Sequence, residues 1–256
     1  MGFIRVLALF VLLVHGWSHA APSAEDILVA SDAIRNPGKP FAVTVTLTEF
    51  LNGKQVDTST LRSYSRTQQD SGQFSSLIQF VLPARDAGKL MLKNGNDMWF
   101  YDPTSKASVR LSPQQRLLGQ ASNGDVTTVN LAKDYKATLA GEEEITDGER
   151  KKRRAHKLFL VADSPGVTYA SIEMWVDTDN NRPLKARFFA ESSRLLKTVY
   201  YRRYQPQLGA DRPTESVIID GLNPQAVTLM RFSDYSTRSI PETWMQRDYL
   251  PRFQPE

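Results

Sequence analysis

Apolar and polar residues alternate along most of this chain, which is the pattern of strands with one buried face. Val43, Val45 and Leu47 share one face, with threonines between them. An Asn-Gly pair at 52–53 favours a hairpin turn, and a second strand is predicted over 58–66. Similar short runs, separated by Pro, Gly, Asn or Asp, occur at 74–82, 89–93, 98–101, 108–111, 135–144, 156–162, 169–177, 184–191, 195–204, 215–220 and 226–235. The pattern predicts about eleven strands joined mainly as hairpins.

A meander of this length cannot stay flat, because each strand twists by roughly 20 to 25° relative to its neighbour. The sheet must therefore curl into a barrel or half-barrel with an inside. One helix is predicted over 24–36, where Ser23 and Asp26 have capping-box spacing and Asn36-Pro37-Gly38 ends the apolar period. The fold class is thus mainly β with a few helices.

The run of strands is interrupted once at length, between Ser112 and Lys133. An interruption of this size is typical of a lid or a disordered loop. Arg116 and the pair Leu117-Leu118 favour a short helix that makes an apolar contact. Arg116 is also one candidate to tie a lid to the barrel by hydrogen bonds; the others are Arg62 and Arg66 on the second strand.

The N-terminus has the pattern of a secretory signal peptide over residues 1–20. Arg5 precedes an apolar run from Val6 to Val14, and Ser18-His19-Ala20 forms a cleavage site before Ala21. We expect a single mature domain over 21–256, outside the cytoplasm. The chain has no cysteine, so the signal cannot end in an acylated cysteine, and we expect the mature protein to be soluble.

Composition narrows the chemistry. The net charge of +4 falls to +3 without Arg5, which is too little to imply nucleic acid. After signal removal, His156 is the only histidine, so zinc sites, thiol nucleophiles and Ser-His-Asp triads are incomplete. We predict no catalytic residue, no metal site and no cofactor.

One segment begins like a calcium loop, at Asp177-Thr178-Asp179-Asn180-Asn181. That motif needs Gly at its sixth position and Glu at its twelfth, where this chain has Arg182 and Phe188. The segment is predicted to be a hairpin turn.

The strongest charge run is 150–154, followed by His156 and Lys157. With Asp147-Gly148 as a two-residue turn, Lys151, Lys152 and Arg153 would face Glu144, Glu143 and Glu142 respectively. The run is then mainly a solvated hairpin. Docking on an anionic membrane or an acidic partner is the alternative.

Several ordered segments resemble the LolA-like outer membrane lipoprotein-sorting family of Gram-negative bacteria. They are Met98-Trp99-Phe100-Tyr101-Asp102-Pro103, Arg110-Leu111-Ser112, 134–143, Trp175-Val176-Asp177, Pro183-Leu184-Lys185-Ala186, Leu195-Leu196-Lys197-Thr198 and Ile240-Pro241-Glu242. The resemblance covers nearly all of residues 24–253.

The resemblance implies an incomplete antiparallel β-barrel closed at one side by a few short helices that form a lid. It also implies a non-enzymatic, monomeric carrier in the periplasm that shields acyl chains of lipoproteins or other lipids from water. An inner-membrane transporter would be the donor, and the acceptor would lie in the outer membrane. Nucleic acid is not an expected partner.

Strand alternation then predicts which residues form the cavity wall and the lid. The predicted wall consists of Val43, Val45, Leu47, Ile78, Phe80, Phe100 and Met174, and the predicted lid contacts are Arg116, Leu117 and Leu118. Two other functions remain open: a lipid- or lipoprotein-sensing regulatory module of the same fold, and an acid-base hydrolase with a carboxylate pair in a polar cleft.

Overall fold

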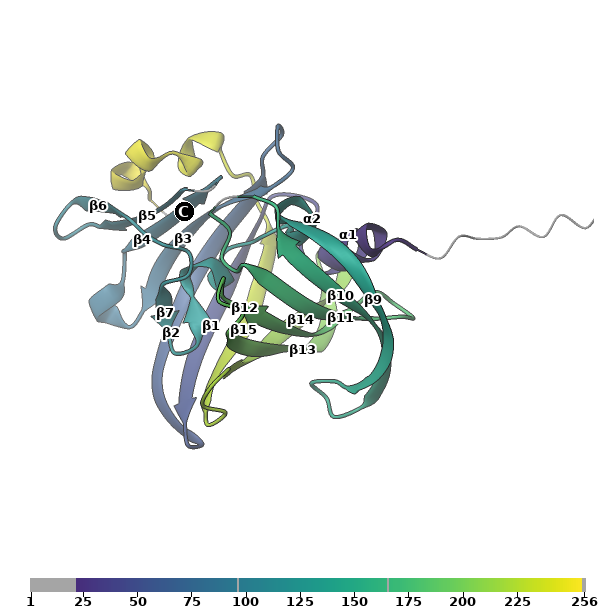
Figure 1. The fold of residues 1–256 in the computed structure, drawn as a ribbon. Coiled ribbons are helices and arrows are strands. Elements are labelled where there is room, and N and C mark those ends of the chain that lie inside the picture. Colours follow the sequence, from purple (N-terminus) through teal and green to yellow (C-terminus); the bar gives the residue numbers. More distant parts are fainter. Residues whose placement is uncertain (1–21, 96, 165, 255–256) are drawn as a thin grey trace, which may run out of the picture.

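Thirteen antiparallel strands form one continuous sheet in the computed structural model, which describes residues 22–95, 97–164 and 166–254 (Figure 1). The strands are β1 (Phe41–Leu51), β2 (Lys54–Thr67), β3 (Phe74–Leu82), β4 (Leu90–Asn94), β5 (Asp97–Asp102), β6 (Ala107–Arg110), β9 (Tyr135–Thr146), β10 (Lys152–Ala162), β11 (Ser171–Asp177), β12 (Pro183–Phe189), β13 (Leu195–Gln207), β14 (Ala210–Asp220) and β15 (Ala226–Thr237). The predicted signal peptide, residues 1–20, lies outside the described residues.

The sheet curves strongly but does not close on itself. Its strand order is β6-β5-β4-β3-β2-β1-β15-β14-β13-β12-β11-β10-β9, so β6 and β9 are its two edges. The predicted half-barrel architecture is confirmed. The predicted count of about eleven strands is wrong, because the described residues form fifteen: these thirteen, and the short pair β7 (Arg116–Leu118) and β8 (Ala121–Ser122).

The β1–β2 hairpin follows from its turn residues. Asn52 and Gly53 both have positive φ, at 51° and 76°, as a primed two-residue turn requires. Leu51 pairs directly with Lys54, and the strands alternate from there. The hairpin predicted from the Asn-Gly pair is confirmed.

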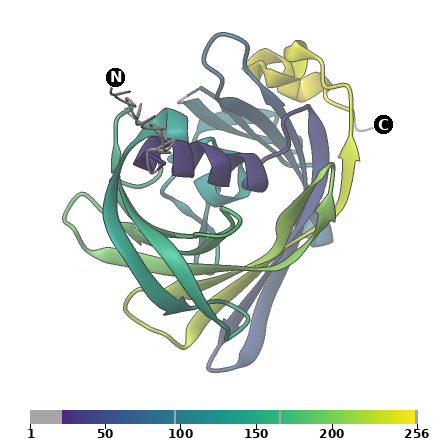
Figure 2. The same ribbon diagram turned by 90° about the vertical axis from the view of Figure 1, so that its right-hand side faces the viewer.

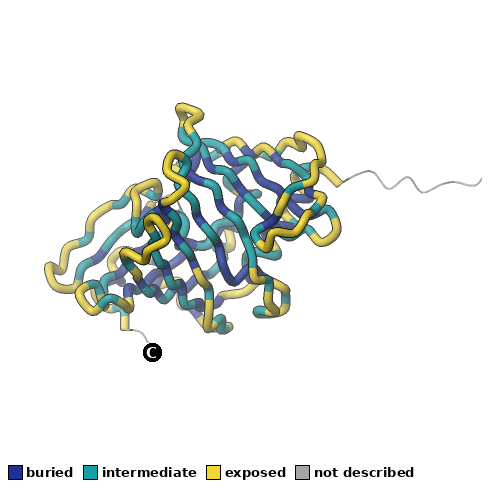
Figure 3. Tube along the Cα trace, turned by 90° about the horizontal axis from the view of Figure 1, so that it is seen from below, coloured by how far each residue is buried: buried dark blue, intermediate teal, exposed yellow. Residues whose placement is uncertain are grey.

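The main core lies on the concave face of the sheet. Inward residues such as Leu47, Leu61, Ile78, Leu158 and Ile172 are fully buried and belong to one apolar cluster. Figure 3 shows burial concentrated in the middle of the strands and exposure in the hairpin loops. Burial of this face is the main source of stability in a chain without disulfides.

Helix α1 (Ala24–Arg35) lies across one opening of the curved sheet (Figure 2). Ser23 and Asp26 form the predicted capping box, with the Asp26 amide donating to Ser23 Oγ at 3.1 Å and the Ser23 amide donating to Asp26 Oδ2 at 3.2 Å. The helix predicted over 24–36 is therefore confirmed.

The convex face carries a second, smaller core under the C-terminal segment. Here η3 (Glu242–Met245) and η4 (Arg247–Arg252) cover β2 to β5. Tyr64, Trp244 and Phe253 pack edge to face, with ring centroids 4.9 to 5.6 Å apart. A further 3-10 turn, η1 (Ala84–Asp86), follows β3.

The basic hairpin between β9 and β10 has a different register from the predicted one. Arg154 lies opposite Glu144 and His156 opposite Glu142, because the turn is longer than two residues. Asp147 holds that turn by accepting from the amide of Lys151 at 2.8 Å. The predicted pairs are wrong, but ion pairs still join the two strands: Lys152–Glu144 at 2.8 Å and Arg154–Glu142 at 2.7 Å.

Residues 112–133, which we call the insert, interrupt the run of strands and fold back against the concave face. It contains β7, β8, η2 (Asn123–Val126) and most of α2 (Leu131–Asp134). The predicted short helix at Arg116 and Leu117-Leu118 is wrong, because these residues form β7 and pair with β8. Short helices and a small hairpin together cover this side of the barrel.

Candidate functional site

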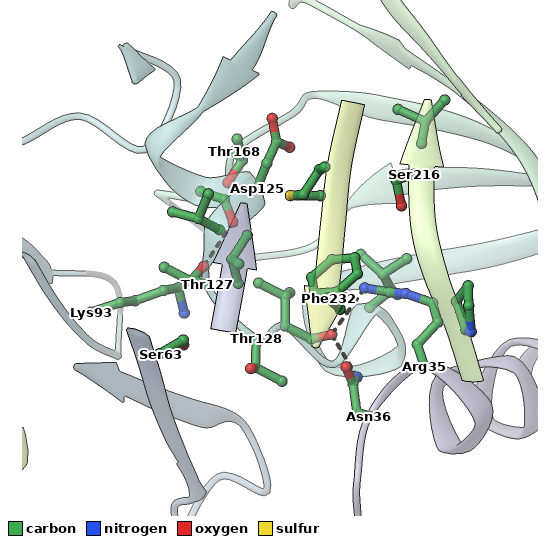
Figure 4. A pocket seen from close by; sticks show the side chains of 18 of the residues that line it. Arg35, Asn36, Ser63, Lys93, Asp125, Thr127, Thr128, Thr168, Ser216 and Phe232 are labelled. Atoms are coloured by element: carbon green, nitrogen blue, oxygen red, sulfur yellow. Dashed lines mark hydrogen bonds between the residues drawn. The ribbon is translucent and has the colours of Figure 1, made fainter. Parts of the chain in front are cut away.

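A cavity of about 160 Å³ lies between the insert and the concave face of the sheet. Its walls are mainly apolar side chains from strands on the concave side and from the insert, and Figure 4 shows the polar side chains that surround them. The apolar wall includes Val43, Val45, Val126, Val129, Val199, Ile218 and Met230. The curved sheet thus retains an internal space that its own core does not fill.

Hydroxyl and amide groups attach one side of the insert to the sheet. The Ser65 and Thr128 hydroxyls are 2.7 Å apart, and the Thr128 amide donates to Ser76 Oγ at 3.2 Å. Gln73 and Asn130 exchange two hydrogen bonds of 2.8 and 3.0 Å. Because water replaces such a bond when it is broken, each one contributes little to holding the insert, of order 1 kcal/mol.

The other end of the insert approaches β15 through a glycine. Gly119 has a φ of 53°, and a Cβ there would lie 2.3 Å from Thr228 Oγ1. The next amide, of Gln120, donates to the same hydroxyl at 2.8 Å. Only glycine permits both this backbone conformation and this approach.

A buried ion pair joins the insert to β13. Lys197 is 3% exposed and pairs with Asp125 of η2. Asp125 also accepts from the Tyr169 hydroxyl at 2.7 Å and from the Ser122 amide at 2.7 Å. Burial lowers the pKa of the Lys197 ammonium, and the Asp125 carboxylate opposes that shift.

Helix α1 holds the end of the insert through a second buried carboxylate. Asp32 is 4% exposed and accepts from the Ala132 amide at 2.9 Å and from Arg35 at 2.8 Å. Asn36, just beyond the helix, donates to the Val129 carbonyl at 2.8 Å. Burial raises the pKa of the Asp32 carboxyl from 3.8 to about 6, although the Arg35 guanidinium opposes the shift.

This pKa gives Asp32 a measurable effect on stability. A raised folded-state pKa means that its contribution is fully present below about pH 4 and is lost as pH rises through about 6. The native chain should therefore lose about 3 kcal/mol of unfolding free energy as the Asp32 carboxyl ionises, and Asp32→Asn should not show this loss. Urea unfolding from pH 4 to 7.5 measures it: the variant's stability relative to the native chain should rise with pH, and parallel curves would contradict the assignment.

The predicted wall residues occupy two kinds of place. Val43 and Val45 line the cavity. The other five pack into the main core on the concave side and do not line the cavity; they are Leu47, Ile78, Phe80, Phe100 and Met174. Their side chains fill the barrel beyond the cavity, where Phe80 and Phe100 meet edge to face at 6.0 Å.

The predicted lid residues lie in β7 of the insert. Leu117 and Leu118 pack against the main core while partly exposed. Arg116 pairs with Asp220 at the end of β14 at 3.1 Å, so it does tie the insert to the barrel. The other two candidates lie elsewhere: Arg62 bonds to Thr44 and the β15 backbone, and Arg66 to the Ile240 carbonyl.

The buried pair of Asp125 and Lys197 was missed from the sequence. Lys197 stands two residues before Val199, at an inward position of the β13 alternation. A lysine at such a position needs a partner, and this was the available signal. Nothing local pointed to Asp125, which is 72 residues away.

The other chemical candidates have ordinary positions. The calcium-like segment forms the predicted turn between β11 and β12, with the Asp179 amide donating to Asp177 Oδ1 at 2.9 Å. In the part of the chain that the structure describes, no three histidine or acidic side chains are grouped to hold a metal ion. None of the helices described there has the length and apolar character to cross a membrane.

An open antiparallel barrel of this kind defines a class of β proteins, and solved structures with a similar fold include three from different bacteria. A LolA superfamily protein from Nitrosomonas europaea is 32% identical, with a TM-score of 0.80 over 90% of this chain and 100% of that one. A DUF1329 family protein from Desulfovibrio piger is 21% identical, with a TM-score of 0.74 over 89% and 97%. A putative outer membrane lipoprotein-sorting protein domain from Vibrio parahaemolyticus is 18% identical, with a TM-score of 0.72 over 90% and 98%.

The first of these similarities extends to sequence as well as fold. This chain belongs to the LolA superfamily. A family model described as "Uncharacterized protein" also matches residues 72–252. No curated protein matches the chain.

Proposed function

We propose that this protein is a carrier that takes up an acyl chain of a lipoprotein or another lipid between its sheet and its insert. The observation that carries the proposal is the apolar cavity bounded by Val45, Val199, Ile218 and Met230 on the sheet and by Val126 on the insert. An acyl chain gains about 0.8 kcal/mol for each CH₂ that leaves water. An apolar cavity against a movable segment supplies that environment.

The size of the cavity requires the insert to move. A volume of about 160 Å³ matches an engineered cavity of about 150 Å³ that accepts benzene. Sites for larger ligands occupy about 300 to 1,000 Å³. A whole acyl chain therefore needs more space than this cavity offers, and in this proposal it gains that space when the insert leaves the concave face.

The side of the insert at Thr128 and Asn130 is suited to such movement because polar groups attach it. Its contacts through Ser65, Ser76 and Gln73 are hydrogen bonds that water can replace. Loading and release then depend on the difference in lipid affinity between the open and closed forms. Transport needs no covalent step, and we propose none.

The proposal includes where the protein acts and with which partners. The signal-peptide pattern at residues 1–20 supports a periplasmic location. There the carrier receives its cargo from an inner-membrane donor and delivers it toward the outer membrane. Fractionation of expressing cells tests the location: the chain should be released with the periplasm and begin near Ala21.

Binding of a neutral fluorescent acyl probe tests the function. We expect the purified chain to bind the probe with saturation, and Val199→Phe to weaken binding at least tenfold because the ring fills the cavity. Val199 pairs with Ile218 on the neighbouring strand, and both line the cavity. Val217 precedes Ile218 in that strand, so its side chain points to the other face of the sheet. Val217→Phe is therefore the matched control on the opposite face, and it should bind normally. Absence of saturable binding to the native chain would contradict the proposal.

A further inference from the structure

The cavity has a polar corner that the carrier function does not explain. Lys93 of β4 and Ser63 of β2 both line it, among otherwise largely apolar strand residues. Ser76 pairs with Lys93 and, on its other side, with Ser65, which shares a face with Ser63. Lys93 thus lies two strands across the sheet and two residues along it from Ser63, and both residues line the same cavity. Figure 4 shows both side chains on one side of the pocket.

Among the described residues, the buried Ser63 hydroxyl has no hydrogen-bond partner, and the half-buried Lys93 has no close carboxylate. The Ser63 side chain is 1% exposed, and its hydroxyl makes no hydrogen bond to any described residue. Among the same residues, no carboxylate lies within 4.0 Å of the Lys93 ammonium, as it does for buried Lys197. Asp134 is the acidic group that acts on Lys93 electrostatically, from a greater distance. A buried hydroxyl without a partner in a native cavity needs an explanation.

We propose that Lys93 and Ser63 bind the carboxylate of a single-chain fatty acid whose alkyl chain occupies the apolar part of the cavity. One ammonium and one hydroxyl provide two donors, which match the two oxygens of a carboxylate. One unpaired positive charge also matches one negative charge. The inference rests on the proposed function, since it names the class of cargo for the same cavity.

The balance of charge favours a monoanion. Around the cavity, Arg35 is paired with Asp32, and Lys197 with Asp125. Lys93 and Asp134 are the other charged side chains that line the cavity, and they lie farther apart than an ion pair. Burial lowers the pKa of Lys93 and raises that of Asp134. An incoming carboxylate would stabilise the charged form of Lys93 at close range. A doubly charged phosphate would bring more negative charge than this corner can offset.

Competition binding with laurate, methyl laurate and dodecyl phosphate tests the assignment. For the native chain we expect laurate to bind at least tenfold more tightly than methyl laurate, because a hydrogen-bonded charge pair is worth roughly one order of magnitude. Lys93→Met should abolish this preference while leaving methyl laurate within twofold. Ser63→Ala should reduce it severalfold. Lys54→Met, which removes the same charge from the exposed β1–β2 turn, should change nothing.

The outcomes separate the two proposals. If neither laurate nor its ester binds, the carrier function fails. If both bind equally, or if Lys93→Met weakens both alike, the carboxylate site is wrong while the carrier function stands. Tighter binding of dodecyl phosphate than of laurate would also overturn the assignment to a fatty acid.

Discussion

Replacing Lys197 with methionine is expected to lower the free energy of unfolding by about 3 to 5 kcal/mol. The change leaves the Asp125 carboxylate, 12% exposed, without its cation inside the barrel. The Tyr169 hydroxyl and the Ser122 amide still donate to Asp125, but neither carries a compensating charge. Urea unfolding of the two chains at pH 7 measures the loss.

Two further variants separate the buried pair from a general effect of losing a lysine. Asp125→Asn combined with Lys197→Met removes both charges, so it should recover most of the loss. Lys136→Met breaks an exposed pair with Asp163, whose side chains are 78% and 49% exposed, and should cost no more than about 1 kcal/mol. Equal losses for Lys197→Met and Lys136→Met would show that the buried pair does not hold the insert to β13.

Local patterns were sufficient for the elements whose structure depends on neighbouring residues. The capping box of Ser23 and Asp26 and the turn at Asn52 and Gly53 each formed as their spacing predicted. Alternation placed the strands of the large sheet, because one buried face is enough to fix the period of two. It also placed Val43 and Val45 on the concave face beside the cavity.

The insert was poorly predicted because its conformation depends on distant partners. Leu117 and Leu118 have good helix propensity, but this stretch forms a hairpin whose Gly119 fits against Thr228. Tertiary contact overrides propensity in so short a segment. The C-terminal end of the insert is likewise fixed from α1, through Asp32 and Asn36.

The register of the basic hairpin was wrong for a related reason. The sequence suggested a two-residue turn at Asp147-Gly148, whereas the Asp147 carboxylate accepts from the amides of Glu149 and Lys151. Arg150 adopts a φ of 62° within this longer turn. Because turn length sets register, each cross-strand pair moved while the alternation of charge along the strands still allowed ion pairs.

The cavity wall could be predicted only in part, since alternation identifies a face and not the part of that face left unfilled. Phe80 and Met174 are buried on the concave side, and Phe100 packs against the same core while half-buried. Which inward residues border empty space depends on where the insert packs. That packing depends on contacts between distant parts of the chain, such as those of Thr128 with Ser65 and Ser76. The alternation within a single strand does not reveal such contacts.

We propose that the insert must leave the concave face before an acyl chain can enter. A disulfide between residues 65 and 128 tests it, because the hydroxyls of Ser65 and Thr128 are 2.7 Å apart. The chain contains no cysteine, so Ser65→Cys with Thr128→Cys would form a single defined cross-link with a normal sulfur separation after small adjustments.

A second cross-link controls for the disulfide itself. Thr48 and Thr58 face each other on β1 and β2, with hydroxyls 3.5 Å apart. Thr48→Cys with Thr58→Cys would therefore join two strands of the sheet and leave the insert free. Both oxidised proteins should remain folded.

The decisive measurement is binding of the neutral acyl probe to each double-cysteine chain before and after reduction. We expect the oxidised 65–128 protein to lose binding at least tenfold and to regain it when reduced, whereas the 48–58 protein should bind equally in both states. Undiminished binding by the oxidised 65–128 protein would show that the ligand binds without movement of the insert.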